Sequence, residues 1–305
     1  MHHTPTTDTH RPEATPPHPA IALANVSVRL GGKTVLRDLD LTVETGEVFA
    51  LLGANGAGKT TTIGILTTLL RPDSGRVSLC GVDVLDRPDE ARRCFAVTGQ
   101  SAAVDHYLTT AENLMLLGRL SGLSAREAKA RTAELAERLS LRGFIDSRVG
   151  TLSGGMRRRL DLALSLVVPV DVLVLDEPTT GLDTRSRREL WDEVARLSDE
   201  GTTVFLTTQY LEEADALADR IGLLHEGRLA GLGTPDELKA RVGEDTVAIL
   251  DGNGAALTEA PTDGTVRGIS AVLDSLDEDL AEATVSLRRP SLDDVFLSFT
   301  SGDRS

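Results

Sequence analysis

The sequence predicts an α/β fold in which helices cover a mainly parallel sheet, with a helical subdomain inserted into it and a small α+β domain at the C-terminus. Three observations predict this fold. A glycine-rich loop lies between a buried strand and a helix, apolar strands alternate with helices after it, and the composition changes after about Lys239. A chain of 305 residues, of which 40% are hydrophobic, is long enough to build one large or two modest domains.

The N-terminus, residues 1–19, is rich in Pro, Thr and His and lacks the basic and apolar regions of a signal peptide. We expect it to be a disordered tail. Four of the six histidines lie there, but no helix or cysteine fixes a metal-binding geometry around them. Cys80 and Cys94 match no metal or redox spacing, and two isolated thiols fit a reducing cytosol.

The first half of the main domain alternates strands with one helix. Val48–Leu52 is a continuous apolar run of the kind found in buried strands. A helix is expected over Thr60–Leu70, stopped by Pro72, and Ser74-Gly75 then turns the chain into the next strand. The strands expected here are Ile21–Leu30, Leu36–Val43, Val48–Leu52 and Arg76–Cys80.

Between about residues 101 and 160 the pattern changes to a helical period, with a capping box at Ser124-Ala-Arg-Glu127. This stretch is the predicted helical subdomain. After it, strands resume and alternate with a helix near Arg185–Ser198, which completes a domain over residues 20–238. The later strands are Val172–Leu175, Val204–Leu206 and Ile221–Leu224.

Residues 239–305 form the predicted accessory domain. Gly243–Gly268 is rich in Gly, Asp and Thr and contains one strand candidate, Val247–Leu250. An acidic helix near Ile269–Glu282, a strand at Ala283–Arg288 and an amphipathic end at Ser291–Thr300 follow. The alternative is a loosely ordered tail.

The loop Gly53-Ala-Asn-Gly-Ala-Gly-Lys-Thr60 fits the phosphate-binding pattern G-x-x-x-x-G-K-[ST]. Its glycines allow backbone N–H groups to face phosphate oxygens, and the helix N-terminus adds positive potential. Lys59 is expected to reach the outer phosphates and Thr60 to ligate Mg²⁺. The residues predicted to bind ATP here are Gly53, Asn55, Gly56, Ala57, Gly58, Lys59, Thr60 and Thr61.

Two acids end the apolar strand Val172-Leu-Val-Leu-Asp-Glu177. Asp176 is expected to hold Mg²⁺, directly or through water. Glu177 either faces the other side of the strand or sits at its end, where it can orient or deprotonate the attacking water. The alternative without a function is that Glu177 is a solvated acid at the end of the strand.

Taken together, these motifs resemble the ATP-binding subunit of an ABC transporter, over about Ile21 to Thr234. The resemblance implies a P-loop NTPase fold of ABC type with ATP and Mg²⁺ as cofactors. Leu152-Ser153-Gly154-Gly155 looks like the family signature, which contacts the phosphate bound by the opposite subunit, so a homodimer is implied. By the same resemblance, Gln100 senses Mg²⁺ and couples to the membrane partner, and Asp183 lies in the dimer-contact loop.

Two positions depart from the family. Gln209 stands where a histidine usually follows the strand ending in Thr208. A glutamine amide can donate to a phosphate oxygen but cannot titrate, so we expect no switch histidine here. No aromatic residue precedes the phosphate loop to stack on adenine, and Leu30 or Arg29 is expected to pack on the base less specifically.

The stretch from Gln209 to Asp215, together with Leu292-Asp293-Asp294-Val295-Phe296, is similar to the drug-export branch typified by daunorubicin-resistance ATP-binding proteins. The resemblance implies an ATPase that powers export of a hydrophobic small molecule through a separate integral membrane permease, at the cytoplasmic face of the membrane. No apolar run approaches the ~20 residues that span a bilayer.

Two alternatives remain. One is a soluble ABC-type ATPase of a ribosome, DNA-repair or iron–sulfur assembly, although a net charge of −15 argues against nucleic acid. The other is a self-resistance protein that binds the drug through its C-terminal segment, which is poor in aromatic residues.

Overall fold

The structure is a computed structural model that describes residues 18–98, 104–251, 255–275, 280 and 283–301. Most of the predicted N-terminal tail and Gln100 lie outside the described residues. No helix in the part of the chain that is described combines the length and apolar character needed to cross a bilayer.

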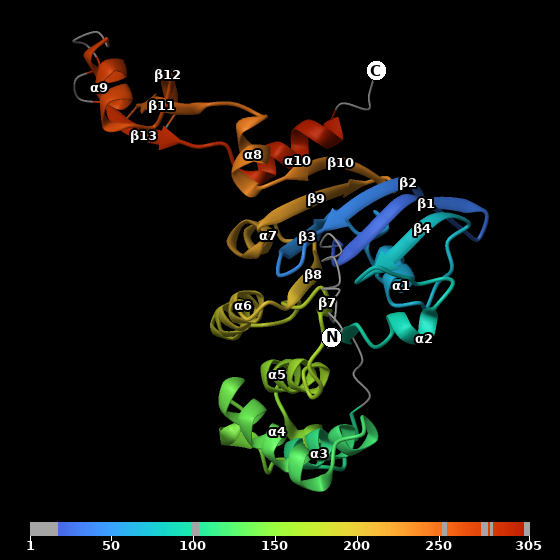
Figure 1. The fold of residues 1–305 in the computed structure, drawn as a ribbon. Helices are drawn as coiled ribbons and strands as arrows, with labels where there is room; N and C mark the ends of the chain where they lie inside the picture. The colour runs from blue at the N-terminus through green and yellow to red at the C-terminus, as the bar shows by residue number, and fades with distance from the viewer. Residues whose placement is uncertain (1–17, 99–103, 252–254, 276–279, 281–282, 302–305) are drawn as a thin grey trace, which may run out of the picture.

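The centre of the molecule is a six-stranded sheet in the order β10-β9-β3-β8-β7-β6 (Figure 1). Five of its strands run parallel, and β10 is an antiparallel edge strand on β9. This confirms the predicted mainly parallel sheet. Its strands are β3 (Val48–Leu52), β6 (Phe95–Thr98), β7 (Val172–Asp176), β8 (Thr203–Thr208), β9 (Arg220–His225) and β10 (Arg228–Gly233).

The apolar runs form the middle of this sheet because both of its faces are covered. All five residues of β3 and all six of β8 are buried. Alternate side chains enter two separate hydrophobic clusters, with Ala50 in one and Phe49 in the other. Phe49 stacks on Phe205 of β8 with ring centroids 5.7 Å apart.

A second sheet of order β2-β1-β4-β5 is antiparallel and packs on one of these clusters. The sequence predicted its longer strands but not that they form a sheet of their own. Gly31 and Gly32 adopt positive φ in the hairpin that joins its first two strands, a conformation that glycine adopts without a Cβ clash. Its strands are β1 (Ile21–Leu30), β2 (Lys33–Val43), β4 (Ser74–Leu79) and β5 (Val82–Asp83).

The helix after the glycine loop, α1 (Lys59–Leu66), is shorter than predicted. It ends before Pro72 because Thr68 adopts a left-handed φ of 61°, and the N–H groups of Leu69 and Leu70 turn back to the carbonyl of Gly64. Helix α2 (Pro88–Ala91) follows β5.

The predicted helical region contains α3 (Thr110–Leu120) and α4 (Ala125–Arg138), followed by α5 (Gly154–Ser165), which leads toward β7. Both α3 and α4 begin with capping boxes, and Ser124 caps α4 as expected. Figure 1 shows these three helices grouped at the opposite end of the molecule from the C-terminal sheet.

Helix α6 (Thr184–Asp199) joins this group to the sheet, and α7 (Leu211–Leu217) follows β8. Glu193 of α6 is buried and forms ion pairs with Arg138 of α4, at 2.5 Å, and with Arg196.

The C-terminal part begins with α8 (Pro235–Ala240) and forms a three-stranded sheet of order β12-β11-β13. Its elements are β11 (Asp245–Leu250), β12 (Ala256–Thr262), α9 (Val266–Asp274), β13 (Thr284–Arg288) and α10 (Leu292–Ser301). The prediction of one strand within Gly243–Gly268 was wrong, because the mostly exposed β12 pairs with β11 and lacks a clear apolar alternation. The acidic helix also starts three residues early, where Thr265 caps it.

Helix α10 returns to the main sheet while β11–β13 extend away from it (Figure 1). Leu292 and Val295 are buried in the same cluster as β3 and β7, and α10 contacts α7 and α8. The last helix therefore packs against the first predicted domain. The predicted division of the chain near residue 238 stays a prediction.

Candidate functional site

The glycine loop follows the carboxyl end of β3 and opens directly into α1. A Cβ on Gly53 would lie 2.5 Å from the carbonyl oxygen of Leu224, so only glycine fits there. Gly58 has a φ of 115° and precedes the first helical residue, and no side chain caps this helix end. The first N–H groups of α1 therefore face the loop without a side-chain acceptor, which is the arrangement that binds anions.

Lys59 is the first residue of α1, and its side chain folds back over the loop. Its ammonium group donates to the carbonyl oxygens of Gly53, at 2.7 Å, and Ala54, at 3.3 Å. It also lies 3.5 Å from Oε1 of Glu177. The loop thus holds a cation that is only 5% exposed at its centre, beside the exposed residues Ala54, Asn55 and Gly56.

Asp176 is the last residue of β7, and its Oδ1 atom accepts a 2.7 Å hydrogen bond from the hydroxyl of Thr207 in β8. The register that pairs Asp176 with Thr207 places this hydroxyl beside the carboxylate. Because α1 packs against β7, the carboxylate and the exposed Thr60 lie at the same edge of the sheet. Sequence reasoning did not identify Thr207, although a hydroxyl near the end of an apolar strand is a signal for such a role.

Glu177 lies beyond the strand end, which decides between the two orientations left open by the sequence. Its φ of 44° is left-handed, an uncommon conformation for a side chain other than Asn, Asp or Gly. Its N–H group donates to the carbonyl of Thr207, at 3.1 Å, and Thr180 donates to Oε2 at 3.5 Å. This backbone directs the carboxylate toward Lys59, and such strain is concentrated at functional sites.

The signature residues form the N-terminus of α5. Ser153 is the N-cap, and its hydroxyl accepts from the N–H group of Met156 at 3.3 Å. Gly155 lies beside Ser186 and Leu182, so a Cβ there would meet the Ser186 hydroxyl at 2.8 Å. Ser153 and Gly154 are exposed, which leaves this helix end open to a second molecule.

Arg158, one turn along α5, connects the signature helix to the two acids. Its guanidinium donates to the carbonyl oxygens of Pro178, at 2.8 Å, and Asp176, at 3.2 Å. Burial lowers the pKa of Arg158, against the opposing effect of nearby Asp161 and Asp176. Sequence reasoning missed Arg158, and its only local signal is its position four residues after Gly154.

Asp183 caps α6 through a 2.8 Å hydrogen bond from the N–H group of Ser186 to Oδ1. This hydrogen bond lowers the pKa of Asp183. The carboxylate is exposed, so capping and a contact with another subunit are compatible.

Gln209 lies between β8 and α7 and lines a cavity of about 210 Å³. Gly53, Ala54 and Asn55 of the phosphate loop form one wall, and Phe296 of α10 forms another. The structure thus places the predicted Gln209 beside the phosphate loop. The structure also places Phe296 in the lining of this cavity. Sequence analysis used Phe296 only as part of the C-terminal stretch that resembles the drug-export branch.

Leu30 is the last residue of β1 and is 43% exposed, beside the hairpin at Gly31. The predicted contact of Leu30 with adenine stays a prediction. Arg29 is also exposed, and its N–H group donates to Asp73 at 2.6 Å.

Comparisons with known proteins are consistent with this geometry. The model of a family described as ABC transporter matches residues 36–180. The chain is 47% identical to a daunorubicin resistance ATP-binding protein of Streptomyces coeruleorubidus, over 93% of this chain and 97% of that protein. It is 44% identical to the Nod factor export ATP-binding protein I of Burkholderia orbicola, over 78% of this chain and 79% of that protein.

Among solved structures, the chain is similar to a dimeric ATP-binding cassette in a post-hydrolysis state bound to ADP and Pi. The TM-score is 0.64 at 25% identity, covering 70% of this chain and 98% of that one.

Proposed function

The chain belongs to the family of ABC transporter ATP-binding subunits, and from this premise we propose that it powers export of a hydrophobic small molecule or antibiotic through a separate membrane permease. As a member of this family the chain is an ATPase. Two relatives that cover most of the chain are named for daunorubicin resistance and for Nod factor export. Since these names differ in cargo, the permease is the component expected to select the substrate.

The observation that carries the ATPase mechanism is the convergence of Lys59 and Glu177 at the mouth of the phosphate loop. The ammonium group and the N–H groups of α1 supply positive charge to the phosphates of ATP. Glu177, held by the backbone of Thr207, orients the attacking water and accepts its proton. Gln209, beside Gly53 and Ala54, donates its amide to an outer phosphate oxygen.

The residues present fit a magnesium ion. Thr60 offers an exposed hydroxyl, and Asp176 offers a carboxylate whose Oδ1 is oriented by Thr207. Hydroxyl and carboxylate oxygens are the ligands that Mg²⁺ prefers. When bound, Mg²⁺ would neutralise charge on the phosphate oxygens during transfer.

Family members of this kind form dimers and work with membrane permeases, and here we propose a homodimer. The exposed N-terminus of α5, with Ser153 and Gly154, would contact the phosphate bound to the other copy. Arg158 joins this helix to Asp176 and Pro178, so contact at the signature would be transmitted to the acids of its own chain. We place the assembly at the cytoplasmic face of the cell membrane.

The test uses a tagged Glu177→Gln chain expressed in its own host, trapped with ATP and purified from solubilised membranes. An equal ratio of a multi-span membrane protein in the purified complex supports the transporter assignment, and that permease can then be used to identify the cargo. Lys59→Ala serves as the matched control, because it should not trap ATP. Recovery of a soluble homodimer alone, or of ribosomal or repair components, would contradict the proposal.

A further inference from the structure

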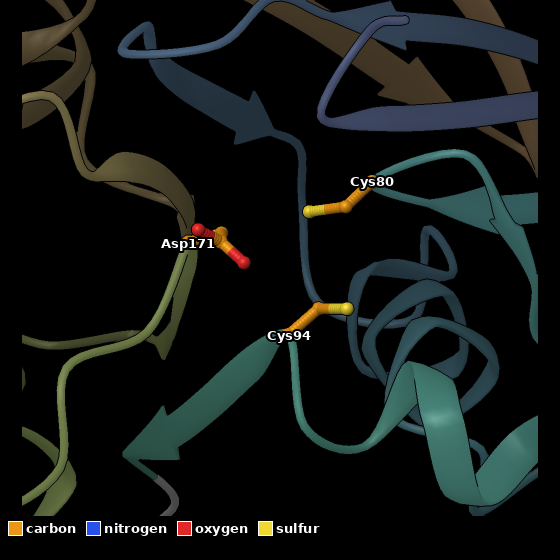
Figure 2. A group of neighbouring side chains, drawn as sticks. All are labelled: Cys80, Cys94 and Asp171. Atoms are coloured by element: carbon orange, nitrogen blue, oxygen red, sulfur yellow. The ribbon is translucent and has the colours of Figure 1, made fainter.

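Two cysteines and an aspartate that lie far apart in the sequence meet at one edge of the main sheet. Cys80 follows the last residue of β4, Cys94 precedes β6, and Asp171 precedes β7. The two sulfur atoms and a carboxylate oxygen of Asp171 all lie within 4.8 Å of one another. Figure 2 shows the three side chains coming from these separate segments.

Backbone hydrogen bonds hold the three residues in place. The carbonyl oxygen of Cys94 accepts from the N–H groups of Asp171, at 3.1 Å, and Val172, at 2.9 Å. The N–H group of Cys80 donates to the carbonyl of Ala20 at 2.8 Å, and Cys80 has a left-handed φ of 50°. The positions of the donors are therefore set by the ends of paired strands rather than by a mobile loop.

We propose that Cys80, Cys94 and Asp171 form a binding site for Zn²⁺ or a closely similar borderline cation. Two thiolates and one carboxylate are a donor set that suits Zn²⁺, whereas Mg²⁺ prefers oxygen ligands alone and Cu⁺ prefers sulfur. Tetrahedral Zn²⁺ with Zn–S bonds of about 2.3 Å needs sulfur atoms about 3.8 Å apart. The two sulfur atoms are no more than 4.8 Å apart, so they would need to approach by at most about 1 Å to reach this separation.

Zn²⁺ must displace the thiol protons to bind here, and Asp171 supplies a carboxylate beside them. Burial is the main cause that raises the pKa of the Cys80 thiol to about 12, and it also raises the pKa of Cys94. Asp171 adds to both shifts, and no ion pair formed within the described part of the chain includes Asp171. A bound cation would supply the positive charge that lets the thiols ionise.

Cys80 and Cys94 are free thiols that lie close to each other. The Cys94 thiol donates to the carbonyl of Glu90 at 3.7 Å. The ring of His18 lies against Gly81, next to Cys80, but it is not among the donors that lie within 4.8 Å of one another.

The site is separate from the ATP-binding residues. Asp171 immediately precedes β7, and Asp176 is the last residue of that strand. The two aspartates therefore lie at opposite ends of β7, about 16 Å apart along the strand. A bound ion would link β4 of the antiparallel sheet to β6 and β7 of the parallel sheet. It would stabilise the fold without taking part in hydrolysis.

The experiment titrates the full-length chain with Co²⁺ as a spectroscopic probe and then displaces it with Zn²⁺. Thiolate-to-cobalt charge-transfer absorption reports sulfur ligands only, so cobalt bound by the N-terminal histidines does not contribute. We expect a 1:1 end point that is lost in Cys80→Ser and in Cys94→Ser, and affinity at least tenfold weaker in Asp171→Asn. Asp192→Asn, which changes an exposed acid on α6, is the matched control and should bind like the unchanged chain.

A second measurement needs no variant. Zn²⁺ should protect both thiols from alkylation at least tenfold and raise the melting temperature, while basal ATP hydrolysis stays within twofold. Absence of the charge-transfer band, an equal band in both single-cysteine variants, or alkylation unaffected by Zn²⁺ would each overturn the proposal. So would formation of a Cys80–Cys94 disulfide at the same rate with and without Zn²⁺, which would identify a redox pair instead.

Discussion

The ammonium group of Lys59 lies 3.5 Å from a carboxylate oxygen of Glu177, and the two side chains are 5% and 18% exposed. The cation proposed to hold phosphate and the carboxylate proposed to activate water thus form an ion pair. We expect phosphate to compete with Glu177 for Lys59 when ATP binds. Binding is then expected to release the carboxylate for its proposed part in hydrolysis.

Replacing Glu177 by Gln should separate binding from catalysis. We expect kcat to fall at least a hundredfold, because the base is removed. We expect ATP to bind about threefold to tenfold tighter, because Lys59 no longer pairs with a carboxylate. Single-turnover hydrolysis and fluorescent-nucleotide titration measure the two effects, with Asp192→Asn as control. A kcat within fivefold of the unchanged chain would show that Glu177 is not the base.

Gln209 should make the rate independent of a titrating switch residue. The kcat profile of the unchanged chain between pH 5.5 and 8.5 should lack an inflection caused by position 209, and Gln209→His should introduce one near pH ~6.5. Gln209→Ala should lower kcat by about tenfold to a hundredfold through loss of a phosphate donor. The idea fails if the unchanged chain shows a limb that disappears in Gln209→Ala but persists when His106 or His225 is replaced.

Nucleotide preference should be weak because Leu30, rather than an aromatic ring, is the exposed side chain near the expected adenine position. We expect kcat/KM for ATP to exceed that for GTP by less than a hundredfold. Leu30→Tyr should increase the preference several-fold through stacking. Leu257→Tyr, at another exposed leucine in β12, is the control and should leave the ratio unchanged. A preference above a hundredfold in the unchanged chain would contradict this prediction.

The ion pair between Glu193 and Arg138 should matter for stability because Glu193 is 2% exposed. Glu193→Ala removes the carboxylate that lies nearest to the largely buried guanidinium of Arg138. We expect a loss of about 3 kcal/mol in the free energy of unfolding. Arg196→Ala, at a half-exposed partner of the same carboxylate, should cost less than about 1 kcal/mol. Urea unfolding measures both changes, and equal losses in the two variants would be inconsistent with this account.

Asp161 should make the protein less stable as the pH rises. Burial is the main cause that raises its pKa from 3.8 to about 6, although Arg158 and Arg157 oppose the shift, and its Oδ1 is buried without a hydrogen-bond partner among the described residues. The pKa of Asp161 is higher in the folded protein than in the unfolded chain. Its contribution to the free energy of unfolding is therefore complete below pH 3.8 and is lost as the pH rises through 6.

Between pH 5 and 7.5 this group should lower the free energy of unfolding by about 1 kcal/mol. In Asp161→Asn that part of the pH dependence should be missing, as judged by urea unfolding at the two pH values. Asp192→Asn should keep the pH dependence of the unchanged chain. Identical pH dependence in Asp161→Asn and the unchanged chain would refute the prediction.

Local sequence patterns predicted much of the fold. The buried run Val48–Leu52 was located to the residue, because a strand covered on both faces must be apolar throughout. Ser124 was identified as a helix cap from four residues alone. The end of α1 was misplaced because Thr68 adopts a left-handed conformation that its residue type does not signal, and β12 was missed because it is stabilised by pairing rather than by burial.

The sequence by itself determined the glycine loop, several of the longer strands and helices, and the set of residues proposed to bind ATP, since each depends on residues that are neighbours along the chain. Only the tertiary structure brought Glu177 to Lys59, Phe296 to Gln209, and Cys80 to Cys94 and Asp171. These contacts join segments whose separation is set by strand register and helix packing. Such geometry arises from the collective burial of distant apolar residues and leaves no local pattern at the residues it brings together.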